Sequence, residues 1–215
     1  MLFRARGILA RNLKTNSNKY VLLFLSFVAG IIAGAFTVNG LNPGQSTELE
    51  NYFFGFLHLI NYQNIDSVEL FKITMLENLK LIAVLWGLGV TIIGIPFIYI
   101  VIGIKGFISG FSSGFIIEAA GLRGILFVIA AMLPKELIQV PCLVALGVSG
   151  INFSLNILRS RSHKLPFKSS LKSEFFTYCL ITALFFCLIT AGALLEAYVS
   201  PMLVKMLAPL FENFK

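Results

Sequence analysis

The chain has 215 residues, of which 57% are hydrophobic and 13% are charged. A soluble domain carries about 25% charged residues, so this composition excludes an ordinary soluble enzyme and indicates a protein that folds in lipid. The formal net charge of +7 does not point to nucleic acid, because the basic residues gather beside apolar blocks without a face of interleaved aromatic residues. We therefore expect membrane lipid, and no nucleic acid, as a partner.

Apolar blocks predict an all-α fold, a polytopic membrane helix bundle with five transmembrane helices. A spanning helix needs about 20 mainly apolar residues, and four blocks meet that requirement readily. The fifth, 106–122, is shorter and contains Glu118. The predicted segments are a basic cytoplasmic N-terminus (1–19), a first span (20–38), an extracytoplasmic helical loop (39–78), a second span (79–104), a third span (106–122), an interfacial or re-entrant segment (123–136), a fourth span (137–158), a basic cytoplasmic loop (159–174), a fifth span (175–195) and an extracytoplasmic C-terminal tail (196–215).

Two basic clusters predict the orientation, because Lys and Arg beside membrane helices are retained in the cytoplasm. One cluster precedes the first span and the other lies between the fourth and fifth spans, whereas the loop after Gly40 is mainly acidic. Five crossings place both clusters inside and the C-terminus outside, in a multi-pass membrane protein. Lys105 would then mark a cytoplasmic turn. The clusters are Arg4, Arg6, Arg11, Lys14 and Lys19, and Arg159, Arg161, Lys164, Lys168 and Lys172.

A signal-peptide interpretation of the first block is the alternative, because Ala33-Gly34-Ala35 resembles a small-residue cleavage site. The apolar stretch is longer than the roughly 7 to 15 residues of such a peptide. We therefore favour an uncleaved anchor.

The apolar run from Gly124 to Leu158 is too long for one straight span, since helical rise would carry it about 52 Å through a core of about 30 Å. Prolines lack a backbone donor and clash with the preceding turn. We expect a broken or re-entrant segment around 124–141, with 124–133 in the outer interface or dipping into the bilayer; a single kinked helix is the alternative. The candidate helix breaks are Pro96, Pro134 and Pro141.

The loop after Asn42-Pro43-Gly44 is predicted to form an amphipathic helix. Thr47 and Glu50 have capping-box spacing, and Asp66 with Glu69 would cap a second helical segment. The simpler interpretation is a helix that lies on lipid or packs on its own bundle. The functional one is a docking surface for an extracytoplasmic partner. The apolar stripe consists of Leu49, Tyr52, Phe53, Phe56, Leu57 and Ile60.

Small residues at every fourth position predict close helix contact in the first and third spans. Lipid supplies no hydrophobic drive between helices, so close backbones must gain van der Waals contact instead. Packing within one chain is the more common arrangement, and a homo-oligomer joined by the same faces is the alternative. The helix-packing glycines are Gly30, Gly34, Gly106, Gly110 and Gly114.

Ionisable residues at membrane depth are rare and are functional candidates, of which Glu118 is the clearest. We expect it near the outer end of its helix, close to Arg123 if the chain turns at Gly121. Lys135 and Glu136 should lie at similar outer depth, where a structural cluster is favoured over a proton relay.

No motif in the sequence indicates catalysis. It has no Walker loop, no GxGxxG, and no serine or cysteine that a recognisable motif pairs with a histidine and an acid. All three cysteines lie inside apolar blocks and both histidines are isolated, so we predict neither a disulfide framework nor a metal site. The sequence predicts a non-enzymatic protein without a cofactor.

Several stretches follow one another in a recognisable order over most of the chain. They are the basic lead with Gly30, Gly34 and Asn39-Gly40, then Leu76-Glu77-Asn78-Leu79, then Gly94-Ile95-Pro96 through Gly106, Gly110 and Gly114, and then Leu133-Pro134 and Val140-Pro141. In this order they resemble the stage II sporulation protein M family of bacterial membrane proteins. Lys135 and Gln139 depart from the family, which often has a histidine and a glutamate there.

The resemblance implies a non-enzymatic role in engulfment, when the mother-cell membrane migrates around the forespore during endospore formation. It also implies that such proteins anchor two peptidoglycan-degrading partners, a lytic transglycosylase and an amidase, at the septal membrane. The loop stripe, with Glu118 and Glu136, would bind them. The competing function is a transporter or permease subunit, which acids at membrane depth and a discontinuous helix near Pro134 would favour.

Overall fold

The protein is described here by a computed structural model that covers residues 16–62, 67–162 and 167–207, with side chains except those of 56–62, 161–162, 167–171 and 207. The described residues form helices and no strand. Five of the helices, all except α3, are long and apolar enough to cross a membrane, which confirms the predicted all-α membrane bundle. The helices are α2 (Ser17–Val38), α3 (Pro43–Tyr62), α4 (Ser67–Val90), α5 (Gly94–Ala131), α6 (Leu133–Ser162) and α7 (Phe167–Leu207).

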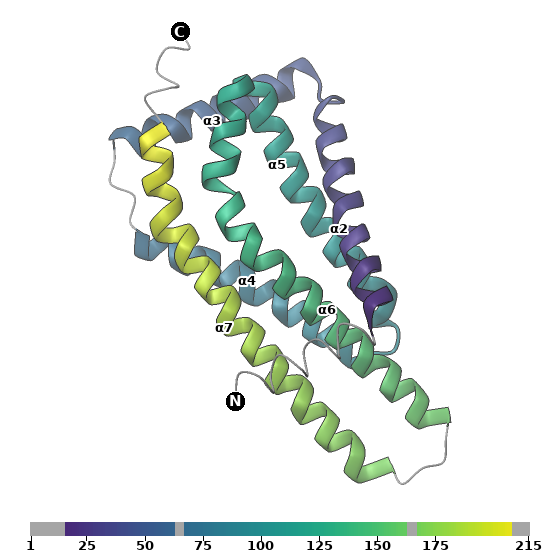
Figure 1. The fold of residues 1–215 in the computed structure, drawn as a ribbon. Coiled ribbons are helices and arrows are strands. Elements are labelled where there is room, and N and C mark those ends of the chain that lie inside the picture. The colour runs from purple at the N-terminus through teal and green to yellow at the C-terminus, as the bar shows by residue number, and fades with distance from the viewer. Residues whose placement is uncertain (1–15, 63–66, 163–166, 208–215) are drawn as a thin grey trace.

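The long helices run up and down between two ends of the bundle (Figure 1). Helix α2 leads to one end, and α3 lies across that end. Helix α4 leads back, α5 rises and then reverses, α6 continues the return, and α7 crosses once more. We call the end covered by α3 the α3 end, and the opposite end, where α2 begins and α6 approaches α7, the basic end. The first and last described residues therefore lie at opposite ends.

The second and third predicted spans do not have the bounds that hydropathy suggested. The chain turns at 91–93 and α5 begins at Gly94, so the apolar block 79–104 is divided between two helices. Glycine is required at position 94 because an added Cβ would overlap the carbonyl oxygen of Leu88. Pro96 lies in the first turn of α5, where no helix partner exists for an N–H. It therefore begins a helix and does not break one.

The chain reverses direction inside α5. Gly121 has φ 58° and ψ −135°, a conformation that glycine alone adopts readily. The returning backbone approaches so closely that an added Cβ at Gly124 would overlap the carbonyl oxygen of Ile116. Residues 122–131 are helical, and only Met132 separates them from α6. The chain is thus broken at Met132, inside the predicted segment 124–141.

Helix α6 is the centre of the bundle. In the most apolar stretch of α6, 61% of the residues are buried inside the protein. In the corresponding stretches of the other four spanning helices, 22–28% are buried. Pro134 is its second residue, beside the break at Met132, and the helix continues past Pro141. Around it pack Leu23, Leu85, Ile98 and Ile189, from α2, α4, α5 and α7.

Helix α2 packs along the rising half of α5 through glycine. An added Cβ at Gly30 or Gly34 would overlap the backbone of α5, and one at Gly106 or Gly110 would overlap the backbone of α2. Gly114 continues the same row. All five predicted packing glycines thus lie in one interface within the chain.

Candidate functional site

Helix α3 turns part of its apolar stripe toward its own bundle. Phe53 is 9% exposed, and its ring meets that of Phe127 edge to face, with centroids 5.4 Å apart. Leu49 packs on the same buried cluster. The side chain of Phe53 is therefore covered by the protein's own bundle and does not form an open surface. The cluster comprises Val38, Phe53, Phe115, Ala120, Phe127 and Val204.

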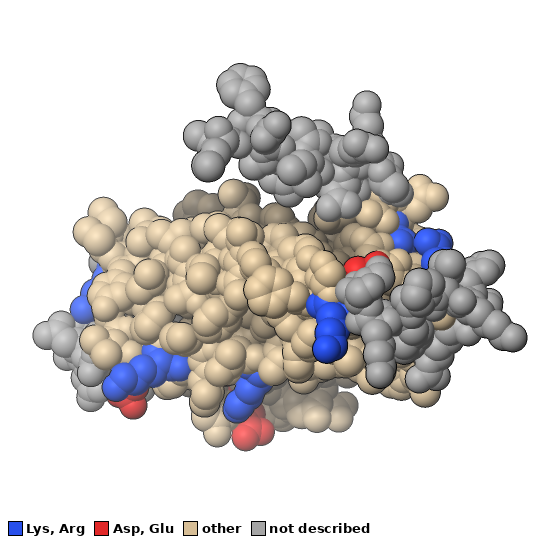
Figure 2. Space-filling view, turned by 90° about the horizontal axis from the view of Figure 1, so that it is seen from below, with Lys and Arg blue, Asp and Glu red and all other residues tan. Residues whose placement is uncertain are grey.

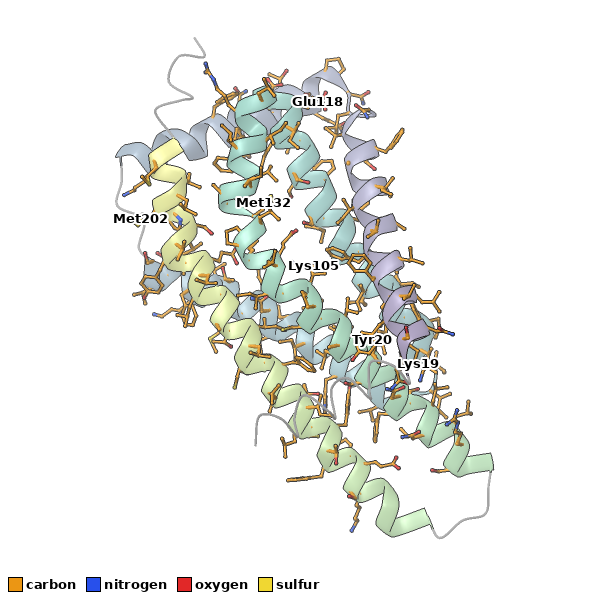
Figure 3. The ribbon with its side chains drawn as sticks, in the orientation of Figure 1. Lys19, Tyr20, Lys105, Glu118, Met132 and Met202 are labelled. Atoms are coloured by element: carbon orange, nitrogen blue, oxygen red, sulfur yellow. The ribbon has the colours of Figure 1, made fainter. Side chains whose placement is uncertain are left out.

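A neighbouring side of α3, adjacent to the buried part of the stripe, is open. Tyr52 is 71% exposed, and Gln45 and Glu48 are exposed at helical spacing before it. Glu118 is exposed as well and lies at the α3 end, near the top of Figure 3. We call Gln45, Glu48 and Tyr52 the outward face of α3. This face and Glu118 offer aromatic and acidic groups on the same end of the molecule.

The two predicted caps of the loop have different outcomes. Helix α3 begins at Pro43, and the Oγ1 of Thr47 donates to the carbonyl oxygen of Pro43 at 2.9 Å. Thr47 is therefore inside the helix and is not its N-cap. Helix α4 begins at Ser67, directly after Asp66, which lies outside the described residues. The side chains of Phe56, Leu57 and Ile60 also lie outside the described part of the chain.

A partly buried lysine lies between the two ends of the bundle. Lys105 belongs to the rising half of α5, at mid-height in Figure 3 and far from both Lys19 and Glu118. Its predicted place at a cytoplasmic turn is wrong, because the turn occurs earlier, at 91–93. The charged groups that act on it electrostatically are Lys135, Glu136, Glu196 and Glu77.

Three polar contacts join α6 to three different helices. Lys135 forms an ion pair with Glu196 of α7, and Glu136 accepts a hydrogen bond from Ser109 of α5. The Nε2 of Gln139 donates to the Oδ1 of Asn78 in α4 at 2.8 Å. Glu136 is thus partly buried between helices, which contradicts its predicted position on an outer docking surface. We call the following residues the inner polar cluster: Asn78, Lys105, Ser109, Lys135, Glu136, Gln139 and Glu196.

The inner polar cluster leaves little space for a ligand beside Lys105. The void there has a volume of about 10 Å³, and the remaining residues that line it are apolar. A void of this size holds about one water molecule. The cluster therefore acts as a set of contacts between helices.

Sequence reasoning missed most of this cluster. Glu196 was assigned to the tail, and neither Asn78 nor Gln139 was recognised as a contact between helices. The available signal was Lys105, because a cation inside an apolar run requires polar partners at its own depth.

The face of the bundle that is seen from below carries few charges. The face in Figure 2 is mostly uncharged, with Lys, Arg, Asp and Glu at separate places. Among the described residues no group of three or more His, Cys, Asp or Glu side chains could hold a metal ion. All three cysteines are free thiols.

Comparison with known families identifies the chain. A family model described as Stage II sporulation protein M matches residues 23–201, from α2 into α7. The chain belongs to the stage II sporulation protein M family. It is thus a multi-pass membrane protein of a sporulation family, and the match includes both the outward face of α3 and the inner polar cluster. No curated protein and no solved structure matches the chain significantly.

Proposed function

We propose that this member of the stage II sporulation protein M family is a non-enzymatic membrane scaffold that holds peptidoglycan-degrading partners at the septal membrane during engulfment. The observation that carries the proposal is α3, which lies across one end of the bundle (Figure 1). It packs on the bundle through Leu49 and Phe53 while Tyr52 stays exposed. A helix already fixed by its bundle loses little further freedom when a partner binds. A scaffold of this kind raises the local concentration of an enzyme without new chemistry.

The orientation that we propose places the basic end in the cytoplasm. Lys19 lies at this end in Figure 3, and Asn152 of α6 accepts a hydrogen bond from it. Ten of the 17 Lys and Arg residues form two clusters, one at and before the start of α2 and one beside the connection between α6 and α7. Positively charged flanks are retained inside, so the α3 end faces the cell wall.

The partner surface that we propose is the outward face of α3 together with Glu118. Tyr52 supplies an exposed aromatic group of the type that anchors protein interfaces, and Glu48 supplies an acid beside it. The partners are the lytic transglycosylase and the amidase that the family resemblance implies. Phe53 has no part in this surface because it holds α3 to the bundle.

Recruitment tests the proposal directly. The double variant Glu48→Lys with Tyr52→Ala, in the full chain, should reduce co-purification of the two hydrolases from sporulating cells about tenfold, as expected for the loss of an interface anchor. The matched control is Glu69→Lys, which reverses an exposed acid on α4 and should leave recovery unchanged. Unchanged recovery with the double variant, or an equal loss with the control, contradicts the proposal.

The orientation has its own test. Cys142, Cys179 and Cys187 are replaced by alanine, and single cysteines are introduced by Ser46→Cys and Ser162→Cys. A membrane-impermeant maleimide should label only the first position in intact cells. Labelling of both positions on the same side of the bilayer would overturn the five-pass orientation and the scaffold surface with it.

A transporter or permease subunit is the second candidate, and the inner polar cluster is the observation that favours it. Polar groups at mid-depth mark substrate paths in transporters. Here the acids have partners and the neighbouring void has about 10 Å³. Proteoliposomes that carry out a flux abolished by Lys105→Met would favour transport over the scaffold.

A further inference from the structure

A cleft of about 210 Å³ with polar and apolar walls lies between α6 and α7, apart from the outward face of α3 and from the inner polar cluster. Its α6 side includes Asn152 and Asn156, and its α7 side includes Glu174 and Thr177. Asn152 is also the residue that meets Lys19, so the cleft lies toward the basic end.

One carboxylate oxygen in this cleft has no partner. The Oε2 of Glu174 is buried without a hydrogen bond. A buried polar atom that has lost water without gaining a partner costs free energy, and the cost is larger for a charged group. A donor brought by a ligand would remove this cost.

Of the four hydroxyl groups that line the cleft, that of Ser173 belongs to an exposed residue, and the other three already donate to carbonyl oxygens. The Oγ of Ser149 donates to the carbonyl oxygen of Ala145, and the Oγ1 of Thr177 donates to that of Ser173, both at 2.9 Å. The hydroxyl of Tyr178 donates to the carbonyl oxygen of Trp86 at 3.2 Å. Each hydroxyl has a single proton, so all three present only lone pairs to the cleft.

This set of acceptors selects a ligand with several donors and a positive charge. A primary ammonium has three N–H donors and no acceptor. The cleft is too large for a bare metal ion, and the described residues contain no group of three His, Cys, Asp or Glu to hold one. An organic ammonium therefore matches the lining better than an inorganic cation.

The rest of the wall indicates what the ammonium is attached to. The Oδ1 of Asn152 accepts from Lys19, which leaves the amide NH₂ of Asn152 to donate to an oxygen. The ring of Phe153 stacks on Tyr178, with centroids 4.9 Å apart and planes within 8°, and gives the cleft an apolar side. A short carbon link could lie against the Phe153 ring, and an oxygen beyond that link could accept a hydrogen bond from the amide of Asn152.

We propose that the cleft binds a primary ammonium group joined by a short link to an oxygen, with Glu174 as its anionic acceptor. Free ethanolamine and the headgroup of phosphatidylethanolamine share this chemistry. The proposal is independent of the scaffold function, because it uses neither α3 nor a protein partner.

The single tryptophan provides a signal for binding. The carbonyl oxygen of Trp86 accepts from Tyr178 of the cleft, and its ring centroid lies 6.2 Å from that of Phe175, the neighbour of Glu174. Full-length protein in detergent is titrated with ethanolamine or choline, and protein in nanodiscs of phosphatidylcholine receives increasing phosphatidylethanolamine. Ethanolamine should change the fluorescence with saturation, whereas choline should not, because a quaternary ammonium has no N–H donor.

The variants separate binding from folding. Glu174→Gln should weaken ethanolamine binding about tenfold, since a hydrogen bond to a charged group is stronger than one between neutral groups. Thr177→Val removes one acceptor and should weaken it about threefold. The control Glu69→Gln changes an exposed acid outside the cleft and should leave the affinity unchanged. If the Glu174→Gln variant does not fold, the affinity of the Thr177→Val variant for ethanolamine tests the proposal.

The two arms also distinguish the source of the ligand. A response to ethanolamine in detergent supports a soluble amine, and a response only to phosphatidylethanolamine in nanodiscs supports a lipid headgroup. The absence of a saturable response in both arms, equal affinity for choline, or unchanged affinity in both cleft variants would overturn the proposal.

Discussion

Helices α2 and α7 are joined to the same bundle in opposite ways. Helix α2 meets α5 along a row of glycines, with the backbones in direct contact. Helix α7 meets α6 through the ion pair of Lys135 with Glu196 and through aromatic stacking nearer the basic end. Lipid gives helices no hydrophobic reason to associate, so either close backbones or paired polar groups must supply the attraction. The α2–α5 interface should therefore be destabilised by an added side chain. The α6–α7 interface should be destabilised by the loss of one member of its ion pair.

The glycine interface should therefore respond most strongly to an added side chain. Gly110→Val places new atoms against the backbone of Ile31, where neither helix backbone can move without separating from the other. We expect a loss of about 3 kcal/mol or more in the free energy of unfolding, at the upper end of overpacking costs. Thermal unfolding in detergent measures it. Gly87→Val is the matched control, because nothing lies within 4 Å of a Cβ at Gly87; equal destabilisation by both variants would refute the contrast.

The charged interface should respond to the loss of one partner more than to the loss of both. Lys135→Met leaves Glu196 without its cation and should cost about 2 kcal/mol, less than the roughly 3–5 kcal/mol of a fully buried pair. The reduction follows from the 22% and 19% exposure of the two side chains. The double variant Lys135→Met with Glu196→Met should recover most of the loss. Additive losses in this cycle would show that the two residues act independently.

The hydrogen-bonded pair of Gln139 and Asn78 should also be more sensitive to the loss of one partner than to the loss of both. The expected losses in the free energy of unfolding are smaller than those for the ion pair. Gln139→Leu removes the donor to Asn78, whose Nδ2 already lacks a partner, and should cost about 1–2 kcal/mol. Replacing both residues by leucine should cost less than the single change, because no buried polar group then remains unpaired. Unfolding of the two variants side by side provides the measurement.

The outward face of α3 should affect stability least. Tyr52→Ala changes an exposed side chain and should alter the free energy of unfolding by less than about 0.5 kcal/mol. The same variant should still fold, insert and retain the α2–α5 interface. A large loss of stability would mean that Tyr52 is a packing residue like its neighbour Phe53.

The part of the fold that sequence could predict is the part set by local pattern. Hydropathy identifies the apolar blocks, and a spacing of four residues identifies the glycine row. Both features depend only on residues that are close together in the sequence. The division of the block 79–104 was missed, since apolar residues continue through the turn at 91–93. Pro96 was misread for the same reason: a proline in a first turn looks like one in the middle of a helix until the boundary is known.

The candidate site was harder to predict because it depends on partners far apart in the chain. Lys105 appeared to mark a membrane surface, since a lone cation between two apolar blocks fits the charge rule. Its real surroundings come from α4, α6 and α7. Likewise, periodicity places Tyr52 and Phe53 on one stripe, but only the path of α3 over the bundle decides that Phe53 is covered and Tyr52 is open.

The ion pair between α6 and α7 has a consequence for biogenesis. The ribosome releases the chain from its N-terminus, so Lys135 leaves it 61 residues ahead of Glu196. Until α7 arrives, the central helix carries an unneutralised charge that the insertion machinery must shelter. Assembly is therefore complete only when α7 packs on α6. We expect membrane proteases to degrade a chain that is truncated before α7.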